Sequence, residues 1–151
     1  MALTRPASQI QPDVDGSYPL LFPRLVQGVL DRNCVECHAR EETAPPLDGE
    51  TAGEYGWSHS FQTLAPFGWS KDGGNGALMG PNGGSRSIAG QVGARASKLF
   101  LMLEEGHHET KLSNEDLHRI TLWLDCNTNF YGGYHETEKQ AVGVAVAPRV
   151  E

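Results

Sequence analysis

The stretch CVECH, residues 34–38, brings two thiols and an imidazole together within five positions. C-x-x-C-H is the attachment signature of c-type haem. The thiols of Cys34 and Cys37 would add across the two vinyl groups of the porphyrin, and the two-residue gap matches the separation of those groups. His38 is then held beneath the ring, where an imidazole nitrogen can become the proximal iron ligand. The spacing therefore predicts one covalently attached haem c with its iron.

Two other uses of the same thiols stay open on the sequence alone. A zinc site could take Cys34 and Cys37, but the second C-x-x-C or H-x-x-x-H cluster that such sites use is missing. The pair His107–His108 is too short to replace it. A thiol–disulfide pair would need a strand-to-helix setting of the βαβ kind, which this chain does not offer. Haem attachment is the interpretation that we favour.

The sixth iron position has three candidate ligands. Met79 lies about forty residues beyond the haem motif, where small cytochromes often place a methionine. His107 follows a predicted helix end on a glycine turn, which can point an imidazole back at a haem face, and its neighbour His108 could take the same role. Two histidine ligands would give a lower reduction potential than a histidine and a methionine. We expect no ligand role for a core methionine and three loop or surface histidines: Met102, His59, His118 and His135.

Three helices are predicted to position these residues. Apolar side chains recur at steps of three and four from Pro23 to about Asn33, directly before the cysteine motif. A second helix is expected from about Arg95 to Glu105, followed by Gly106 as its stop. A third helix begins at Ser113, with an acidic residue at the capping-box position, Asp116.

The segment between the first two helices, residues 41–94, is rich in glycine and shows little periodicity. A loop of this length is uncommon in a compact domain unless it serves a function, and wrapping a cofactor would order it. Arg86 and Arg95 could neutralise haem propionates there, although a solvated position is the default for either one.

Residues near the end of the third predicted helix are expected to serve the fold and not the chemistry. Cys126 is the odd cysteine of three, and we expect it to be a small buried side chain. Asp125 and Asn127 are expected to cap the helix end. An aromatic group that follows is predicted to pack in the helix core or against the porphyrin edge: Trp123, Phe130 and Tyr131.

Length, charge and hydropathy restrict the class of protein. The 151 residues fit one domain, in which a large apolar ligand would help to complete a small core. A net charge of −7 with no basic stripe argues against nucleic-acid binding, and no apolar run is long enough to span a membrane. The first twelve residues lack the features of a secretory signal, whereas c-type haem is attached outside the cytoplasm. We therefore expect a periplasmic or secreted domain, excised from a longer chain.

Two segments resemble a known family. The stretch PLLFPRLVQGVLDRNCVECH, residues 19–38, is similar to the opening of the mono-haem c-type cytochrome domains in hydrazine synthase alpha-subunit-like proteins, and residues 93–136 are similar to their closing section. The likeness spans roughly residues 18–135 and is loose in the glycine-rich middle. The family's glycine–histidine pair falls on Gly106 and His107, which favours His107 as the sixth ligand. Further family positions fall on Leu112, Ser113, Trp123, Asp125, Asn127, Phe130, Tyr131 and Gly132.

The resemblance implies a cytochrome c-like fold and a role in passing single electrons. We expect an all-α domain over residues 18–135, with about three main helices around one covalent haem, an extended lead-in (1–17) and a flexible tail (136–151). The expected function is an electron-transfer module, not an enzyme, that serves a redox partner protein or an attached oxidoreductase domain. Its acidity suggests a partner with a basic docking face. The alternative is a haem enzyme or small-ligand sensor with an open or displaceable sixth iron site.

Overall fold

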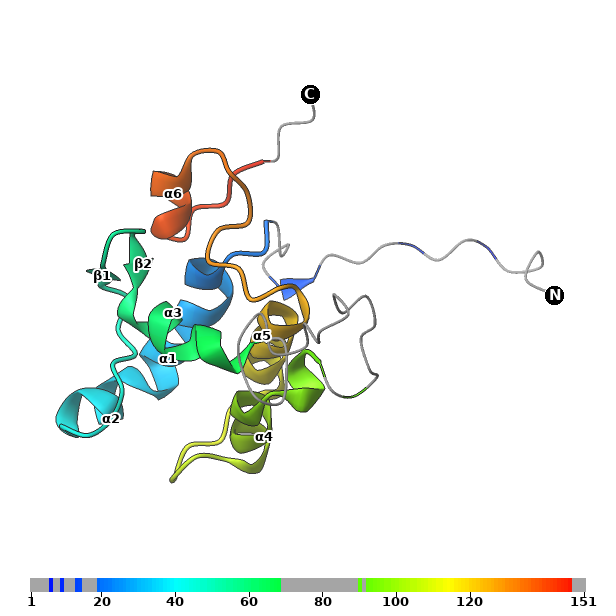
Figure 1. Ribbon diagram of the computed structural model, residues 1–151. Helices are drawn as coiled ribbons and strands as arrows, with labels where there is room; N and C mark the ends of the chain where they lie inside the picture. The colour runs from blue at the N-terminus through cyan, green and yellow to red at the C-terminus, as the bar shows by residue number, and fades with distance from the viewer. Residues whose placement is uncertain are drawn as a thin grey trace, which may run out of the picture.

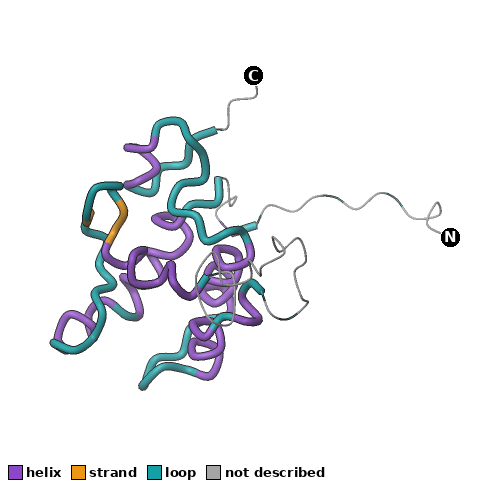
Figure 2. Tube along the Cα trace, viewed as in Figure 1, coloured by secondary structure: helices purple, strands orange, loops and turns teal. Residues whose placement is uncertain are grey.

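The structure is a computed structural model that describes residues 6, 9, 13, 14, 19–68, 90 and 92–147. These residues are mainly helical, and their regular sheet is one short antiparallel hairpin (Figure 2). In chain order the labelled elements (Figure 1) are α1 (Gly28–Asn33), α2 (Val35–Arg40), β1 (Thr51–Ala52), β2 (Trp57–Ser58), α3 (His59–Leu64), α4 (Lys98–Glu105), α5 (Asn114–Asp125) and α6 (Thr137–Ala141). None of the described helices is long and apolar enough to cross a bilayer.

The first predicted helix is present but has two parts. A wider π-helical segment, Pro23–Gln27, runs directly into α1, and its proline occupies the first turn. This position suits proline because the N–H it lacks would have no helical partner. The buried side of the helix carries the residues that the periodicity selected: Leu25, Val26, Val29 and Leu30.

The second and third predicted helices are confirmed by α4 and α5. A 3-10 turn, Ala94–Ala96, precedes α4, and Gly106 follows it with a φ of 104°, a conformation that glycine adopts without strain. The side chain of Ser113 caps α5 by accepting a hydrogen bond from the Asp116 backbone N–H, 3.1 Å. Both ends depend on nearby residues, which explains why local sequence signals located them.

An aromatic cluster forms the centre of the core. The centre of the Phe22 ring lies 5.1 Å from that of Trp123 and 5.2 Å from that of Phe61, and both pairs meet edge to face. Phe61 contacts Phe130 in the same manner, and the Trp123 indole N–H donates to the Asn129 carbonyl, 3.1 Å. The predicted core role of Trp123 and Phe130 is therefore confirmed, because both are buried by other side chains of the protein.

Part of the predicted irregular middle has regular structure. Residues 51–58 form the β1–β2 hairpin, and α3 follows at once, capped by the Ser58 hydroxyl, which accepts from the Phe61 N–H, 3.2 Å. The two strands and α3 are too short to show a periodicity in the sequence. Residues 69–89, with Met79 and Arg86, lie outside the described residues, as does most of the predicted lead-in.

The tail also differs from the prediction, which was a flexible segment from residue 136. It contains α6, and the Gln140 side chain is fully buried. Its oxygen accepts from the Gly132 N–H, 2.8 Å, and its amide nitrogen donates to the carbonyls of Gly133 and His135, 3.1 and 2.6 Å. One polar side chain thus satisfies three backbone groups, which fixes the chain where apolar periodicity is weak.

Replacing Gly93 by alanine is expected to lower the free energy of unfolding by about 2–4 kcal/mol. The φ of this residue is 67°, and an added Cβ would lie 2.3 Å from an Asp125 carboxylate oxygen. That oxygen accepts the Ala94 N–H, 2.7 Å, and links α5 to the turn before α4. Urea denaturation checks the result, with Gly133→Ala as control because a Cβ there meets nothing within 4 Å. Equal stability of the two variants would contradict the prediction.

Candidate functional site

The structure brings His38 and His107 together, although they lie far apart in the sequence. His38 is in the last turn of α2, and His107 is in the turn after α4. The helices α2 and α4 both lie toward the lower side of the view in Figure 1. The ring centres of the two histidines are 6.2 Å apart, with an angle of 44° between the ring planes. His107 is therefore the candidate sixth ligand that faces the histidine of the cysteine motif.

The spacing between these rings has a chemical meaning. A metal–imidazole bond is about 2 Å long. The centre of a five-membered ring with conjugated bonds of 1.33 Å lies about 1.1 Å behind each ring nitrogen. Two imidazoles that bind one ion from opposite sides thus have their centres about 6.2 Å apart. The observed distance between His38 and His107 fits a single iron between them.

A backbone carbonyl orients the His38 ring. His38 Nδ1 lies 2.8 Å from the Pro45 carbonyl oxygen. A carbonyl can only accept, so Nδ1 carries the proton and Nε2 keeps its lone pair. Metal-binding histidines typically have this arrangement, which fixes the tautomer and makes the ligand nitrogen more basic. Sequence reasoning missed this contact because a backbone acceptor has no residue-type signature.

The two thiols and His38 share one face of a helical turn. Cys34 joins α1 to α2, and the His38 N–H donates to its carbonyl, 3.1 Å, which closes the turn. Positions three and four residues apart lie on the same side of a helix, so Cys37 and His38 stand on the side of Cys34. A ligand attached to both sulfurs would therefore also meet the imidazole.

The surroundings of the two thiols bear on the rival zinc site. Burial, with smaller contributions from Asp116 and Cys37, raises the pKa of the Cys34 thiol. Within the described part of the chain, the cluster of three possible metal ligands consists of Asp48, Glu50 and His59, and no cysteine belongs to it.

His107 and His108 differ in their surroundings. Two backbone hydrogen bonds join His107 and Thr110: the N–H of each residue donates to the carbonyl of the other, at 3.0 Å in both cases. Burial, followed by the neighbouring His108 and His38 rings, lowers the pKa of His107, which favours the neutral imidazole that binds metals. His108 is exposed and packs edge-on against His107, with ring centres 4.3 Å apart.

The remaining predicted residues lie away from this histidine pair or serve the fold. His118 faces solvent on α5 as predicted and pairs with Asp13, 2.9 Å, whereas His59 begins α3 instead of lying in a loop. Met102 and Cys126 are exposed, so the prediction that both are buried is wrong. Arg95 and His135 are exposed. The Asp125 carboxylate accepts a hydrogen bond from the Ala94 N–H.

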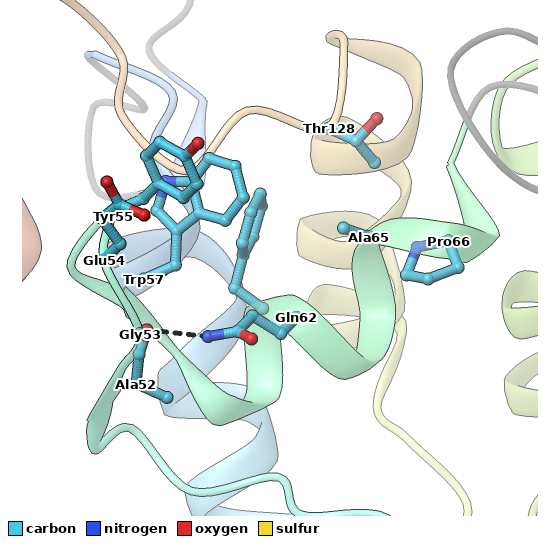
Figure 3. A pocket seen from close by; sticks show the side chains of 10 residues that line it. Ala52, Gly53, Glu54, Tyr55, Trp57, Gln62, Ala65, Pro66 and Thr128 are labelled. Carbon is cyan, nitrogen blue, oxygen red and sulfur yellow. Dashed lines mark hydrogen bonds between the residues drawn. The ribbon is translucent and has the colours of Figure 1, made fainter.

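A separate pocket of about 740 Å³ opens between the hairpin, α3 and the end of α5 (Figure 3). Tyr55 and Trp57 stand together at one side, with Pro66 and Thr128 at the other. Its lining is largely apolar and includes one carboxylate, Glu54, and none of the cysteines or histidines. Its polar side chains are those of Glu54, Tyr55, Gln62 and Thr128.

Comparison of the chain with protein-family models, with curated proteins and with solved structures gives no match. The chemistry of the site must therefore be argued from its own geometry. That geometry is two thiols and a histidine on one helical face, and a second histidine opposite at the spacing of a shared metal ion.

Proposed function

We propose that this chain is a mono-haem c-type cytochrome domain that passes single electrons to or from a partner oxidoreductase or an attached redox domain. Cys34 and Cys37 would hold one haem c, and His38 and His107 would be its axial ligands. The observation that supports this most is the 6.2 Å separation of the two histidine rings, which suits one iron between them. A periplasmic or secreted location belongs to the same proposal, because c-type haem is attached there.

The residues of the chain have distinct roles in this function. When bound, haem supplies an iron that changes between the ferric and ferrous states. The half-buried Cys34 and the exposed Cys37 fix the cofactor to α2. His38 would hold the iron through Nε2, whose lone pair the hydrogen bond from Nδ1 to the Pro45 carbonyl makes more basic, and His107 would supply the second imidazole. With two imidazoles of the protein on the iron, no substrate would have to bind at the metal.

The alternative function is a haem enzyme or sensor in which the sixth ligand leaves to admit a small molecule. The paired hydrogen bonds between His107 and Thr110 argue for a held ligand instead. Gly106, with a φ of 104°, allows the turn that follows α4 and leads into His107. A turn that is both preformed and hydrogen-bonded costs little further ordering when its imidazole binds, which favours stable ligation by two histidines.

The test is a spectrum of the chain produced with an export signal and c-type maturation machinery. The protein is expected to be coloured, to keep its haem after denaturation, and to be six-coordinate in both oxidation states. Carbon monoxide added to the reduced protein should leave the spectrum nearly unchanged, because neither axial position is free. Rapid and complete conversion would support the enzyme or sensor function, and colourless protein would refute haem binding altogether.

A further inference from the structure

We propose that Gln27 and Thr63 are positioning residues for His38: they fix the segment Pro45–Asp48, here named the strap, so that its first carbonyl orients the imidazole. This inference rests on the proposed function, because its consequence is a change in how strongly His38 donates to iron. It assigns a role to side chains that neither touch the thiols nor ligate the metal.

The strap is held through its carbonyl groups. The Pro45 carbonyl accepts from His38 Nδ1, 2.8 Å, and the next carbonyl, of Pro46, accepts from the Thr63 hydroxyl, also 2.8 Å. Proline has no backbone N–H, so neither of these two residues can donate a hydrogen bond. Their location therefore depends on donors from other segments that reach the carbonyl oxygens, and Thr63 of α3 supplies the donor for the carbonyl next to that of Pro45.

The second half of the strap is held in the same way. The Leu47 carbonyl accepts from Gln27 Nε2, 3.1 Å, and the Asp48 carbonyl accepts from the Ser60 N–H, 3.1 Å. Four consecutive carbonyls thus each have a donor, and those donors come from α2, from α3 and from the π-helical segment that leads into α1. The strap therefore ties the helix of the cysteine motif to the rest of the core.

Gln27, itself partly buried, is held by a polar network that extends to two buried serines. Its Oε1 accepts from the hydroxyl of Ser60, which is fully buried, and the Ser58 hydroxyl lies 2.8 Å from that of Ser60. Its amide group also donates to Asp31, 2.8 Å. A buried polar chain of this kind is costly unless every member is paired, and once paired it fixes a single geometry. Gln27 can hold the Leu47 carbonyl because its other hydrogen bonds, to Ser60 and Asp31, restrict rotation of its side chain.

The geometry of the strap has a consequence at the metal. A strong hydrogen bond from Nδ1 gives the imidazole more negative character, which stabilises ferric iron through Nε2. When the Thr63 hydroxyl is lost, the Pro46 carbonyl is released and the adjacent Pro45 carbonyl can move away from His38. The bond at Nδ1 then weakens, the ferric state loses stability, and the reduction potential rises.

The experiment compares Thr63→Val, which keeps the side-chain shape but lacks the hydroxyl, with Thr63→Ser, which keeps the hydroxyl. Thr121→Val is the matched control, because the Thr121 hydroxyl also donates to a carbonyl, that of Leu117, but within α5. Two quantities are measured on the haem-loaded proteins: the reduction potential, and by NMR the exchange rate of the His38 Nδ1 proton with solvent. Thr121→Val shows how far the loss of such a hydroxyl bond in a helix moves either quantity by its effect on stability alone.

Thr63→Val is expected to favour the ferrous state two- to threefold, a rise of about 20–30 mV, and to speed exchange of the Nδ1 proton several-fold. Thr63→Ser and Thr121→Val are expected to match the parent protein, and Gln27→Met, which removes the second clamp, should act in the direction of Thr63→Val. If Thr63→Val and Gln27→Met both behave like Thr121→Val, the inference is overturned while the proposed function stands. Protein that carries no haem would overturn both.

Discussion

In the proposed haem-loaded protein, replacing His107 by alanine is expected to convert a six-coordinate iron that does not bind carbon monoxide into one that binds it rapidly. The reason is the position of this ring, whose centre lies 6.2 Å from that of His38, the spacing expected for two imidazoles that share one iron. Removing it leaves one axial position without a protein donor. The change would be seen in the visible spectrum of the reduced protein before and after carbon monoxide is added.

His108→Ala is the matched control for this variant. His108 is the adjacent residue and carries the same side chain, but it is exposed and its ring packs against His107. The His108→Ala protein should keep the parent spectrum and stay unreactive toward carbon monoxide. The opposite pattern would assign the ligand to His108. If both variants keep the parent spectrum, the assignment of either histidine is wrong, and Met79→Ala tests the third candidate.

Replacing Cys37 by alanine is expected to remove one of the two covalent links, and Cys34→Ala/Cys37→Ala should remove attachment entirely. Cys37 is exposed on α2, so its loss disturbs no core packing and any effect reports on attachment. The measurement is the haem that stays on the polypeptide after denaturation and acid extraction. The double variant is expected to lose all of it, whereas the single variant keeps one thioether bond.

Cys126→Ala serves as the control for both cysteine variants. Cys126 is exposed at the end of α5, outside the cysteine motif. The Cys126→Ala protein should retain all of its haem in denaturant. Loss of haem from this variant, or full retention in the double variant, would refute attachment through Cys34 and Cys37 and would reopen the zinc and dithiol alternatives.

The ends of α4 and α5 show which parts of the fold can be predicted from sequence. A serine hydroxyl that accepts from the N–H three residues ahead, and a glycine with positive φ behind a helix, are interactions between near neighbours. The β1–β2 hairpin and α3 were not predicted, because elements of two to six residues are too short to show a period.

The burial of some side chains, in contrast, could not be predicted from the sequence. Gln140 in the tail is buried, whereas Met102 and Cys126 are exposed. Their burial depends on which distant segments cover them, and residue type gives only an average preference. Leu99 and Leu103 of α4 are buried, yet the same helix leaves Met102 partly in solvent.

The sequence by itself carries the signal on which the proposed haem attachment at residues 34–38 depends, since the spacing of two thiols and an imidazole along one helical turn is a local property. It left three candidates for the opposite ligand and contained no sign of the Pro45 carbonyl. Only the tertiary structure placed His107 across from His38 and the strap against its Nδ1. The physical reason is that both contacts join separate segments, and their geometry depends on how the core packs between those segments.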